Sequence, residues 1–174
     1  MDITNYRDKT EWPDTTPADT EWKGSLVDLF GDLIGAFADV VLPEMVETEL
    51  DEQRELVESG DYCSALLRQA AFVEFLLQWA MIAEIESYRD RELSNKEQKA
   101  IKRMGNKPMV YMANAFGLLT DSEYHAYTEL MDKRNTVAHN WWMAFSDEDR
   151  EDFEDVTGLV LEALESAFED TDFP

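Results

Sequence analysis

The residues of this chain whose types and spacing could do chemistry lie close together, in the stretch 131–140. This stretch reads MDKRNTVAHN and contains Arg134, Asn135 and His139, one of only two histidines in the chain. On a helix, Asn135 and His139 are four residues apart and share a face, and the long side chain of Arg134 reaches the same spot. A guanidinium can hold a phosphate, an imidazole can move a proton, and an amide can orient either one. The stretch therefore suits a phosphodiester.

The run 134–139 matches the pattern R-N-x-x-x-H. It resembles the signature of the HEPN superfamily, whose members are small α-helical proteins and often ribonucleases. The upstream segment 60–77 and an amphipathic helix after the motif are also similar to that family, so the resemblance spans roughly residues 26–169. It implies a motif that works at a homodimer cleft, where two copies supply two histidines. It also implies a toxin or defence effector, held in check by a partner such as a nucleotidyltransferase-like antitoxin.

The predicted reaction is metal-independent cleavage of RNA, without a cofactor, in which the substrate's own 2'-hydroxyl attacks the adjacent phosphorus. An enzyme for this reaction must help deprotonate that hydroxyl, stabilise the added negative charge and protonate the leaving 5'-oxygen. His139 is the candidate general acid or base, Arg134 stabilises charge, and Asn135 orients a phosphate or the imidazole. The sequence contains no glycine-rich phosphate loop and no zinc-ligand spacing.

Two alternatives to catalysis stay open at this point. The motif can be structural, with His139 donating to a carbonyl at the end of its helix, where the helix dipole favours a cation. The protein is then a helical module that binds RNA, a nucleotide or another protein. The second histidine, His125, has no comparable neighbours and is expected on a helix surface, although Tyr124 and Tyr127 nearby could stack on bases.

Two charged residues are conspicuous in the apolar helix expected over 61–88, because burying an unpaired charge is costly. Arg68 and Glu74 lie either at the surface of that helix, or one of them, more readily Glu74, points across to Arg134 or His139. Glu74 and Lys133 are therefore the candidate supporting residues.

A basic segment at 89–107 interrupts the acidic pattern of the chain. It holds seven basic residues, and Lys133 and Arg134 bring the total to nine of the chain's 15. Pooled cations in an acidic protein indicate contact with an RNA backbone, whereas a solvated segment paired with neighbouring acids is the competing interpretation. The candidate RNA-binding residues are Lys96, Lys99, Lys102, Arg103 and Lys107.

The composition indicates a halophilic protein. The 174 residues include 39 acidic and 15 basic ones, which gives a net charge of -24 at pH 7, and concentrated salt screens the repulsion that such a charge causes. A single cysteine, Cys63, excludes an intramolecular disulfide and is expected in the core. Charged residues interrupt the apolar stretches, and the N-terminus lacks a signal-peptide pattern, so we expect a cytoplasmic protein without a membrane contact.

The apolar periodicity predicts an all-α fold, a HEPN-like helical bundle of four to five main helices. Residues 1–23 are expected to form an irregular N-terminal arm, 24–170 the helical domain and 171–174 a tail. Apolar residues follow helical spacing from Leu26 to Val41, and Pro43 should kink or restart that helix. Further helices are expected over 44–58, 61–88, 109–119 and 123–139, and from Ser146 onward, with Asp121 or Ser122 capping the motif helix.

The aromatic run after the motif is too apolar for a free loop. Trp141, Trp142, Met143 and Phe145 follow directly on Asn140. Aromatic residues and methionine are enriched both in protein cores and in interfaces. We therefore expect this run either in the bundle core or at a dimer interface.

Overall fold

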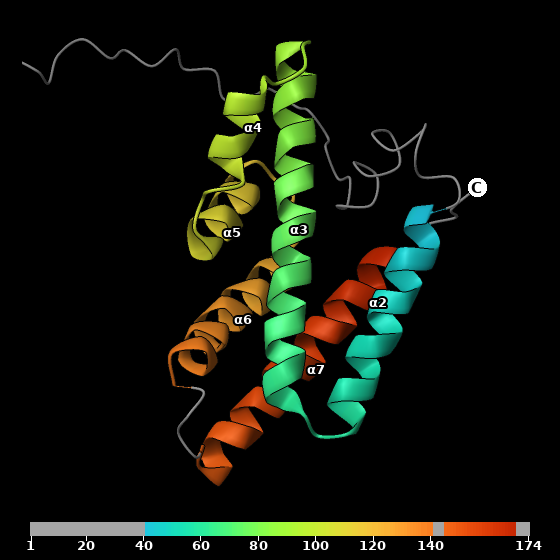
Figure 1. Ribbon diagram of the computed structural model, residues 1–174, viewed down its shortest axis with the longest axis vertical. Helices are drawn as coiled ribbons and strands as arrows, with labels where there is room; N and C mark the ends of the chain where they lie inside the picture. The colour runs from blue at the N-terminus through green and yellow to red at the C-terminus, as the bar shows by residue number, and fades with distance from the viewer. Residues whose placement is uncertain (1–40, 141–144, 170–174) are drawn as a thin grey trace, which may run out of the picture.

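The computed structural model describes residues 41–140 and 145–169, and these residues form helices joined by short turns. The predicted all-α class is therefore confirmed for this part of the chain. Four long helices and two short ones make up the described fold (Figure 1). They are α2 (Val41–Glu58), α3 (Tyr62–Arg89), α4 (Asn95–Ile101), α5 (Asn106–Ala115), α6 (Asp121–Asn140) and α7 (Asp147–Glu169).

Helix α3 lies at the centre of the bundle and packs against each of the other five helices. Its 28 residues make it about 42 Å long. As predicted, the side chain of Asp61 caps it, accepting a hydrogen bond from the backbone N–H of Ser64 at 3.3 Å. The turn before it needs Gly60, whose φ of 75° lies in the left-handed region. A helix that is apolar on most of its circumference can be covered from several sides, which explains this central place.

The core is continuous and joins α3 to the helices on either side of it. On one side α2 and α7 pack together and against α3, and on the other α5 and α6 do so (Figure 1). The largest fully buried apolar and aromatic side chains come from α2, α3, α5, α6 and α7: Val46, Leu66, Leu77, Met81, Met109, Tyr127, Leu130, Met131, Phe153 and Leu164.

The motif helix begins at Asp121, two residues before the predicted start, and its cap is a different residue. The hydroxyl of Thr120 accepts from the backbone N–H of Glu123 at 3.2 Å, and the Glu123 carboxylate accepts from the backbone N–H of Thr120 at 2.7 Å. This reciprocal capping box makes Thr120 the cap, so the prediction of Asp121 or Ser122 is wrong. At α7 the expected cap is confirmed, since Ser146 and Asp149 form the same pair of bonds.

The short helices also differ from expectation. The helix expected over 109–119 is α5, which begins three residues earlier and ends at Ala115. Gly117, with a φ of 75°, turns the chain after it. Helix α4 forms inside the basic segment, where Ser94 and Glu97 make a complete capping box.

By length and composition alone, α3 could cross a membrane. It is the one helix among the described residues that meets this criterion, and 61% of its most apolar window is buried inside the bundle. The charges at Arg68 and Glu74 therefore do not lower its hydropathy as far as the sequence analysis expects. A core helix meets the same criterion because both environments favour a long apolar helix.

Several predictions fall outside the described residues. They are the arm over 1–23, the helix over residues 26–40, the placement of Trp141, Trp142 and Met143, and the tail over 171–174.

Candidate functional site

The motif occupies the last two turns of α6, and its three residues divide between two sides of that helix. Met131 and Val137 are buried, and Arg134 lies between them on the same side of the helix, half-buried. Asn135 and His139 lie on the solvent side and are exposed. The helix therefore holds Arg134 half-buried and His139 in solvent.

The structure brings Arg134 and Asn135 together. Nη1 of Arg134 donates a hydrogen bond to Oδ1 of Asn135, and the two atoms are 3.3 Å apart. Arg134 makes no ion pair with any described residue, and the imidazole of His139 makes no hydrogen bond within residues 41–140 and 145–169. The carbonyl partner that a structural role for this imidazole would require is therefore absent from the described part of the chain. His139 lies one turn beyond Asn135, and its ring nitrogens have no hydrogen-bond partner among the residues that the structure describes.

Two lysines near the motif are paired with carboxylates. Lys133 donates to Asp152 of α7 at 2.5 Å, and Lys107 of α5 pairs with Asp132. The hydrogen bond to Asp132 raises the pKa of Lys107. These two pairs tie α6 to both neighbouring helices just before Arg134. Lys133 thus has a structural partner, and its role as a supporting residue at the site stays a prediction.

Arg68 and Glu74 of α3 have hydrogen-bond partners that lie outside the motif. Arg68 donates to both carboxylate oxygens of Glu49 at 2.7 Å and also pairs with Glu52, so it links α3 to α2. Glu74 accepts from Gln78, one turn later in α3, at 3.1 Å. In the described structure neither side chain makes a hydrogen bond or ion pair to Arg134 or His139. The support expected from Glu74 is therefore not seen here.

The basic segment separates into paired and unpaired cations. Arg89 and Arg91 both pair with Glu97, at 3.4 and 2.7 Å. The hydrogen bonds from Arg91 and then Ser94 hold the pKa of the Glu97 carboxyl well below its usual range. The ammonium of Lys102 lies over the Trp79 ring, 5.5 Å from its centroid, which is a cation–π contact. Arg89, Arg91 and Lys107 are thus paired with acids, whereas Lys102 contacts an aromatic ring, and contact of Lys102 and Lys107 with RNA stays a prediction.

Lys96, Lys99 and Arg103 behave differently, because they are exposed and make no ion pair with any residue that the structure describes. They line one hollow of about 470 Å³ together with Asn95 and Ala100. Their spacing of three and four residues places them along one side of α4 and the turn that follows it. Three unpaired cations around one concavity form a surface suited to a phosphate chain.

A second hollow, of about 360 Å³, lies between the starts of α3 and α7, and no pattern in the sequence predicts it. Its lining includes Tyr62, Cys63, Phe145 and Arg150. Cys63 is half-buried there rather than in the core, and burial raises the pKa of its thiol. The residues come from segments about 80 positions apart in the sequence, so no local pattern could reveal the hollow.

The described residues contain no group of three or more histidine, cysteine, aspartate or glutamate side chains placed to hold a metal ion. Comparison with known proteins gave no match: no family model, no curated protein and no solved structure is significantly similar to this chain. The resemblance to the HEPN superfamily therefore depends on the motif and its context in the sequence.

Proposed function

We propose that this protein is a HEPN-like, metal-independent endoribonuclease whose active site includes Arg134, Asn135 and His139. The observation that carries the proposal is the environment of Arg134. In a chain with a net charge of -24, its guanidinium lies beside a neutral amide and pairs with no carboxylate of the residues that the structure describes. Such a guanidinium keeps its charge available for an anion.

The reaction follows from the chemistry of the three side chains. The 2'-oxygen of a ribose attacks the adjacent phosphorus, the bond from phosphorus to the 5'-oxygen breaks, and a 2',3'-cyclic phosphate forms. His139 accepts the proton of the 2'-hydroxyl or gives one to the leaving oxygen. Arg134 stabilises the negative charge that develops on the phosphoryl oxygens. Asn135 holds the guanidinium in place through the bond to its Oδ1.

One copy of this site supplies one imidazole, whereas the reaction needs two proton transfers. A homodimer in which the motif ends of two α6 helices face each other would supply both. Exposure of Asn135 and His139 supports this arrangement, because both side chains are free to meet a second copy and a substrate. The proposal includes this dimer, a role as a toxin or defence effector, and restraint by an antitoxin, of which a nucleotidyltransferase-like protein is one kind.

The hollow on α4 supplies the substrate-binding part of the proposal. Lys96, Lys99 and Arg103 have no carboxylate partner there, so a phosphate chain that enters the hollow displaces no ion pair. The competing function is a non-catalytic RNA-binding module. Such a module would use the same hollow, and His139 would have no catalytic role in it.

The test is incubation of RNA with the full chain in molar KCl and excess EDTA. The variants are Arg134→Ala and His139→Ala, and the matched controls are His125→Ala and Arg150→Ala, which remove exposed residues of the same types outside the motif. We expect wild type and controls to leave 2',3'-cyclic phosphate ends. Loss of general acid–base catalysis should slow His139→Ala about 10²- to 10⁴-fold.

RNA binding without cleavage by a folded, dimeric wild type would identify the non-catalytic module instead. Equal cleavage by wild type and His139→Ala would exclude the motif as the active site. The role as a toxin has its own test: expression should arrest growth, and Arg134→Ala should relieve the arrest while Arg150→Ala does not.

A further inference from the structure

The segment that forms α5 and the end of α4 is free of acidic residues. Residues 98–120 contain no aspartate or glutamate, although the chain has 39 acidic residues, and no other stretch without one is as long. Burial does not explain this absence, because about half of these residues are exposed. In a chain with a net charge of -24, an exposed segment without carboxylates is the most favourable place for an anion.

An apolar stripe runs along the exposed side of α5. Tyr111 is 46% exposed, Met112 40% and Phe116 43%. The ring of Tyr111 packs near that of Tyr124 in α6, with centroids 6.3 Å apart, and the exposed fraction is what this contact leaves accessible. The stripe consists of five exposed residues whose intervals of three, one, three and one place them on one side of the helix: Pro108, Tyr111, Met112, Ala115 and Phe116.

The stripe begins close to the hollow on α4. Arg103 lines that hollow, and the chain then turns at Gly105 into α5. A Cβ on Gly105 would lie only 3.6 Å from the ring of Pro108. The chain from Arg103 to Pro108 spans at most about 18 Å. Figure 1 shows α4 and α5 one above the other, on the side of α3 away from α2. Unpaired cations and exposed aromatic rings are therefore neighbours on one surface.

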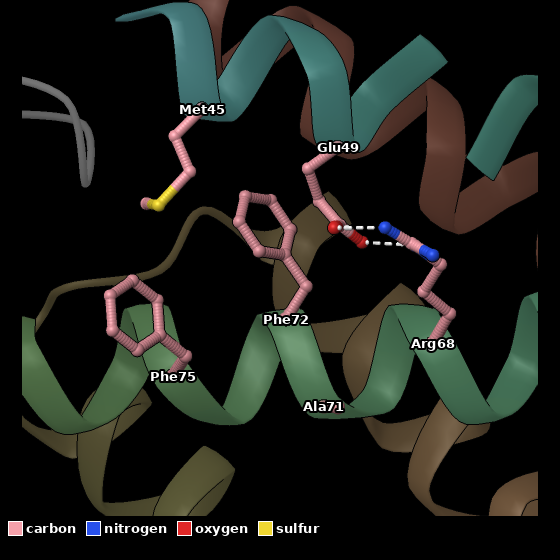
Figure 2. A pocket seen from close by; sticks show the side chains of 6 residues that line it. All are labelled: Met45, Glu49, Arg68, Ala71, Phe72 and Phe75. Atoms are coloured by element: carbon pink, nitrogen blue, oxygen red, sulfur yellow. Dashed lines mark hydrogen bonds and ion pairs between the residues drawn. The ribbon is translucent and has the colours of Figure 1, made fainter. Parts of the chain in front are cut away.

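The groove between α2 and α3 offers a comparison, because it also combines aromatic side chains with a cation. Its volume is about 290 Å³, and Phe72 and Phe75 line it. The cation, Arg68, donates to both carboxylate oxygens of Glu49, as Figure 2 shows. A phosphate in this groove must displace a carboxylate, whereas the cations of the α4 hollow pair with no carboxylate among the described residues. The surface of α4 and α5 is therefore better suited to RNA.

We propose that α5 binds RNA bases, which stack on Tyr111 and Phe116 while phosphates of the same strand lie in the hollow on α4. This inference rests on the proposed function, since it places the bases of the RNA that the motif cleaves. Every base has a flat π-face, so an exposed aromatic ring binds bases of any type by stacking. The bases of a duplex are stacked and paired with one another, so this surface selects strands with unpaired bases.

The start of α5 connects this surface with the motif helix. Lys107 lies one residue before the stripe and pairs with Asp132, two residues before Arg134. Helix α5 also packs directly against α6. A strand bound on α4 and α5 is thus held beside the helix that carries the proposed active site.

The test compares the affinities of the full wild-type chain for two strands at constant KCl concentration. One strand is a short single-stranded oligouridylate, and the other is a ribose-phosphate strand of equal length without bases. Both carry 2'-O-methyl groups, so no 2'-hydroxyl is present to attack the phosphorus. We expect the oligouridylate to bind at least about tenfold more tightly, because stacking adds to the phosphate contacts that both strands make.

Variants then locate the bases. Tyr111→Leu and Phe116→Leu keep an apolar side chain and remove the ring, whereas Tyr111→Phe keeps the ring. The matched control is Phe75→Leu, at a residue of similar exposure, 37%, in the groove of Figure 2. We expect each loss of a ring on α5 to weaken binding of the oligouridylate about fivefold or more. Binding of the strand without bases and the salt slope should not change, since the phosphate contacts remain. Tyr111→Phe and Phe75→Leu should bind both strands as wild type does.

Two outcomes would overturn the inference. Equal affinity of wild type for the two strands would mean that no base is bound, and the stripe would then be a surface for a protein partner. An equal loss of affinity in Phe75→Leu and Phe116→Leu would place the bases elsewhere. The comparison of strands needs only wild type, so it can refute the inference even if a variant does not fold.

Cleavage of unmodified RNA by wild type separates this inference from the proposed function. Cleavage together with equal affinity for the two strands refutes the base-binding surface alone. A preference for the oligouridylate that depends on Tyr111 and Phe116, without any cleavage, supports the surface and refutes the enzyme.

Discussion

Arg134 and His139 differ in their burial and in their hydrogen-bond partners within the protein. Arg134 lies between two buried residues of α6 and donates to Asn135, so its position is held by the fold. His139 is exposed and makes no hydrogen bond to any part of the chain that the structure describes. An imidazole without a protein partner is oriented by what binds next to it, and the proposed dimer and substrate would do this.

The pH dependence of cleavage belongs to this residue scale. General acid–base catalysis makes the rate depend on the protonation of the catalytic side chain, so the rate should change with pH. We expect the change to disappear in His139→Ala and to persist in the control His125→Ala. The measurement is the initial rate of RNA cleavage as a function of pH at constant molar KCl. An unchanged profile in His139→Ala would remove this residue from the proposed mechanism.

Tyr127 gives a stability prediction at the same scale. Its side chain is buried to 1% exposure, and its hydroxyl has no hydrogen-bond partner among the described residues. Burial raises the pKa of this hydroxyl far above its usual range. Because an unpaired buried hydroxyl is unfavourable, Tyr127→Phe should leave the free energy of unfolding equal or higher. Tyr127→Ala should lower it by about 3–5 kcal/mol by opening a cavity.

Urea denaturation of both Tyr127 variants checks this prediction. A loss of more than about 1 kcal/mol in Tyr127→Phe would mean that the hydroxyl has a partner, since that is the usual net contribution of one hydrogen bond.

At the scale of the helices, α4 depends on Glu97 more than on apolar contacts. This carboxylate accepts from Ser94 and from Arg91, and only Ile101 of the helix is buried. These bonds lower the pKa of Glu97, so they stabilise the fold above the ordinary pKa of 4.5, and the stabilisation is lost as the pH falls below that value.

We therefore expect Glu97→Gln to lower the melting temperature at pH 7 and to lower it progressively less below about pH 4.5. The comparison of wild type with variant at each pH cancels the protonation of the other carboxylates. Glu92→Gln, on an exposed residue of the preceding turn, is the matched control. A difference between wild type and Glu97→Gln that grows toward low pH would contradict the assigned bonds.

The hollow on α4 gives a second prediction at this scale. If Lys96, Lys99 and Arg103 contact phosphates, replacing all three by alanine should reduce the salt slope of binding to single-stranded RNA by about 2, since each contact contributes about 0.7. Binding is measured from 0.2 to 2 M KCl, as an order-of-magnitude range, in a His139→Ala background that prevents cleavage. Arg91→Ala, which removes a paired cation, should change the slope less.

An unchanged slope in the triple variant would place the RNA on another surface. The motif could still be catalytic in that case, so this outcome separates the binding surface from the reaction.

At the scale of the whole molecule, charge decides stability. The 39 acidic residues repel one another, whereas the described ion pairs are largely exposed, and exposed pairs contribute little to stability. Salt screens both effects, and the repulsion is the larger one because acidic residues far outnumber basic ones. We expect the melting temperature to rise as KCl increases from about 0.1 M to 2 M. Sorbitol at equal osmolality controls for solvent exclusion, and a fall with KCl would contradict the halophilic interpretation.

Local pattern was sufficient for much of this protein. The all-α class of the described residues, the bounds of α3 to within one residue, the end of α6 to within one residue, and the caps Asp61 and Ser146 all follow from periodicity and cap chemistry, which act over four residues or fewer. The cap of α6 was wrong because Thr120, Asp121 and Ser122 are all capping types and only the backbone geometry selects one. The motif itself is also local in sequence, but only the packing of α6 shows that Arg134 is half-buried while Asn135 and His139 are exposed.

The tertiary structure alone decided which charges are free. Arg68 and Lys133 pair with residues 19 positions away, and Lys107 pairs with Asp132 across two helices, while Lys96, Lys99 and Arg103 remain unpaired. No spacing rule distinguishes these groups, because each contact joins helices that only the fold brings together. The exposure of Leu67 and Phe75 on α3 has the same origin, since an apolar helix shows which side stays exposed only once its neighbours are in place.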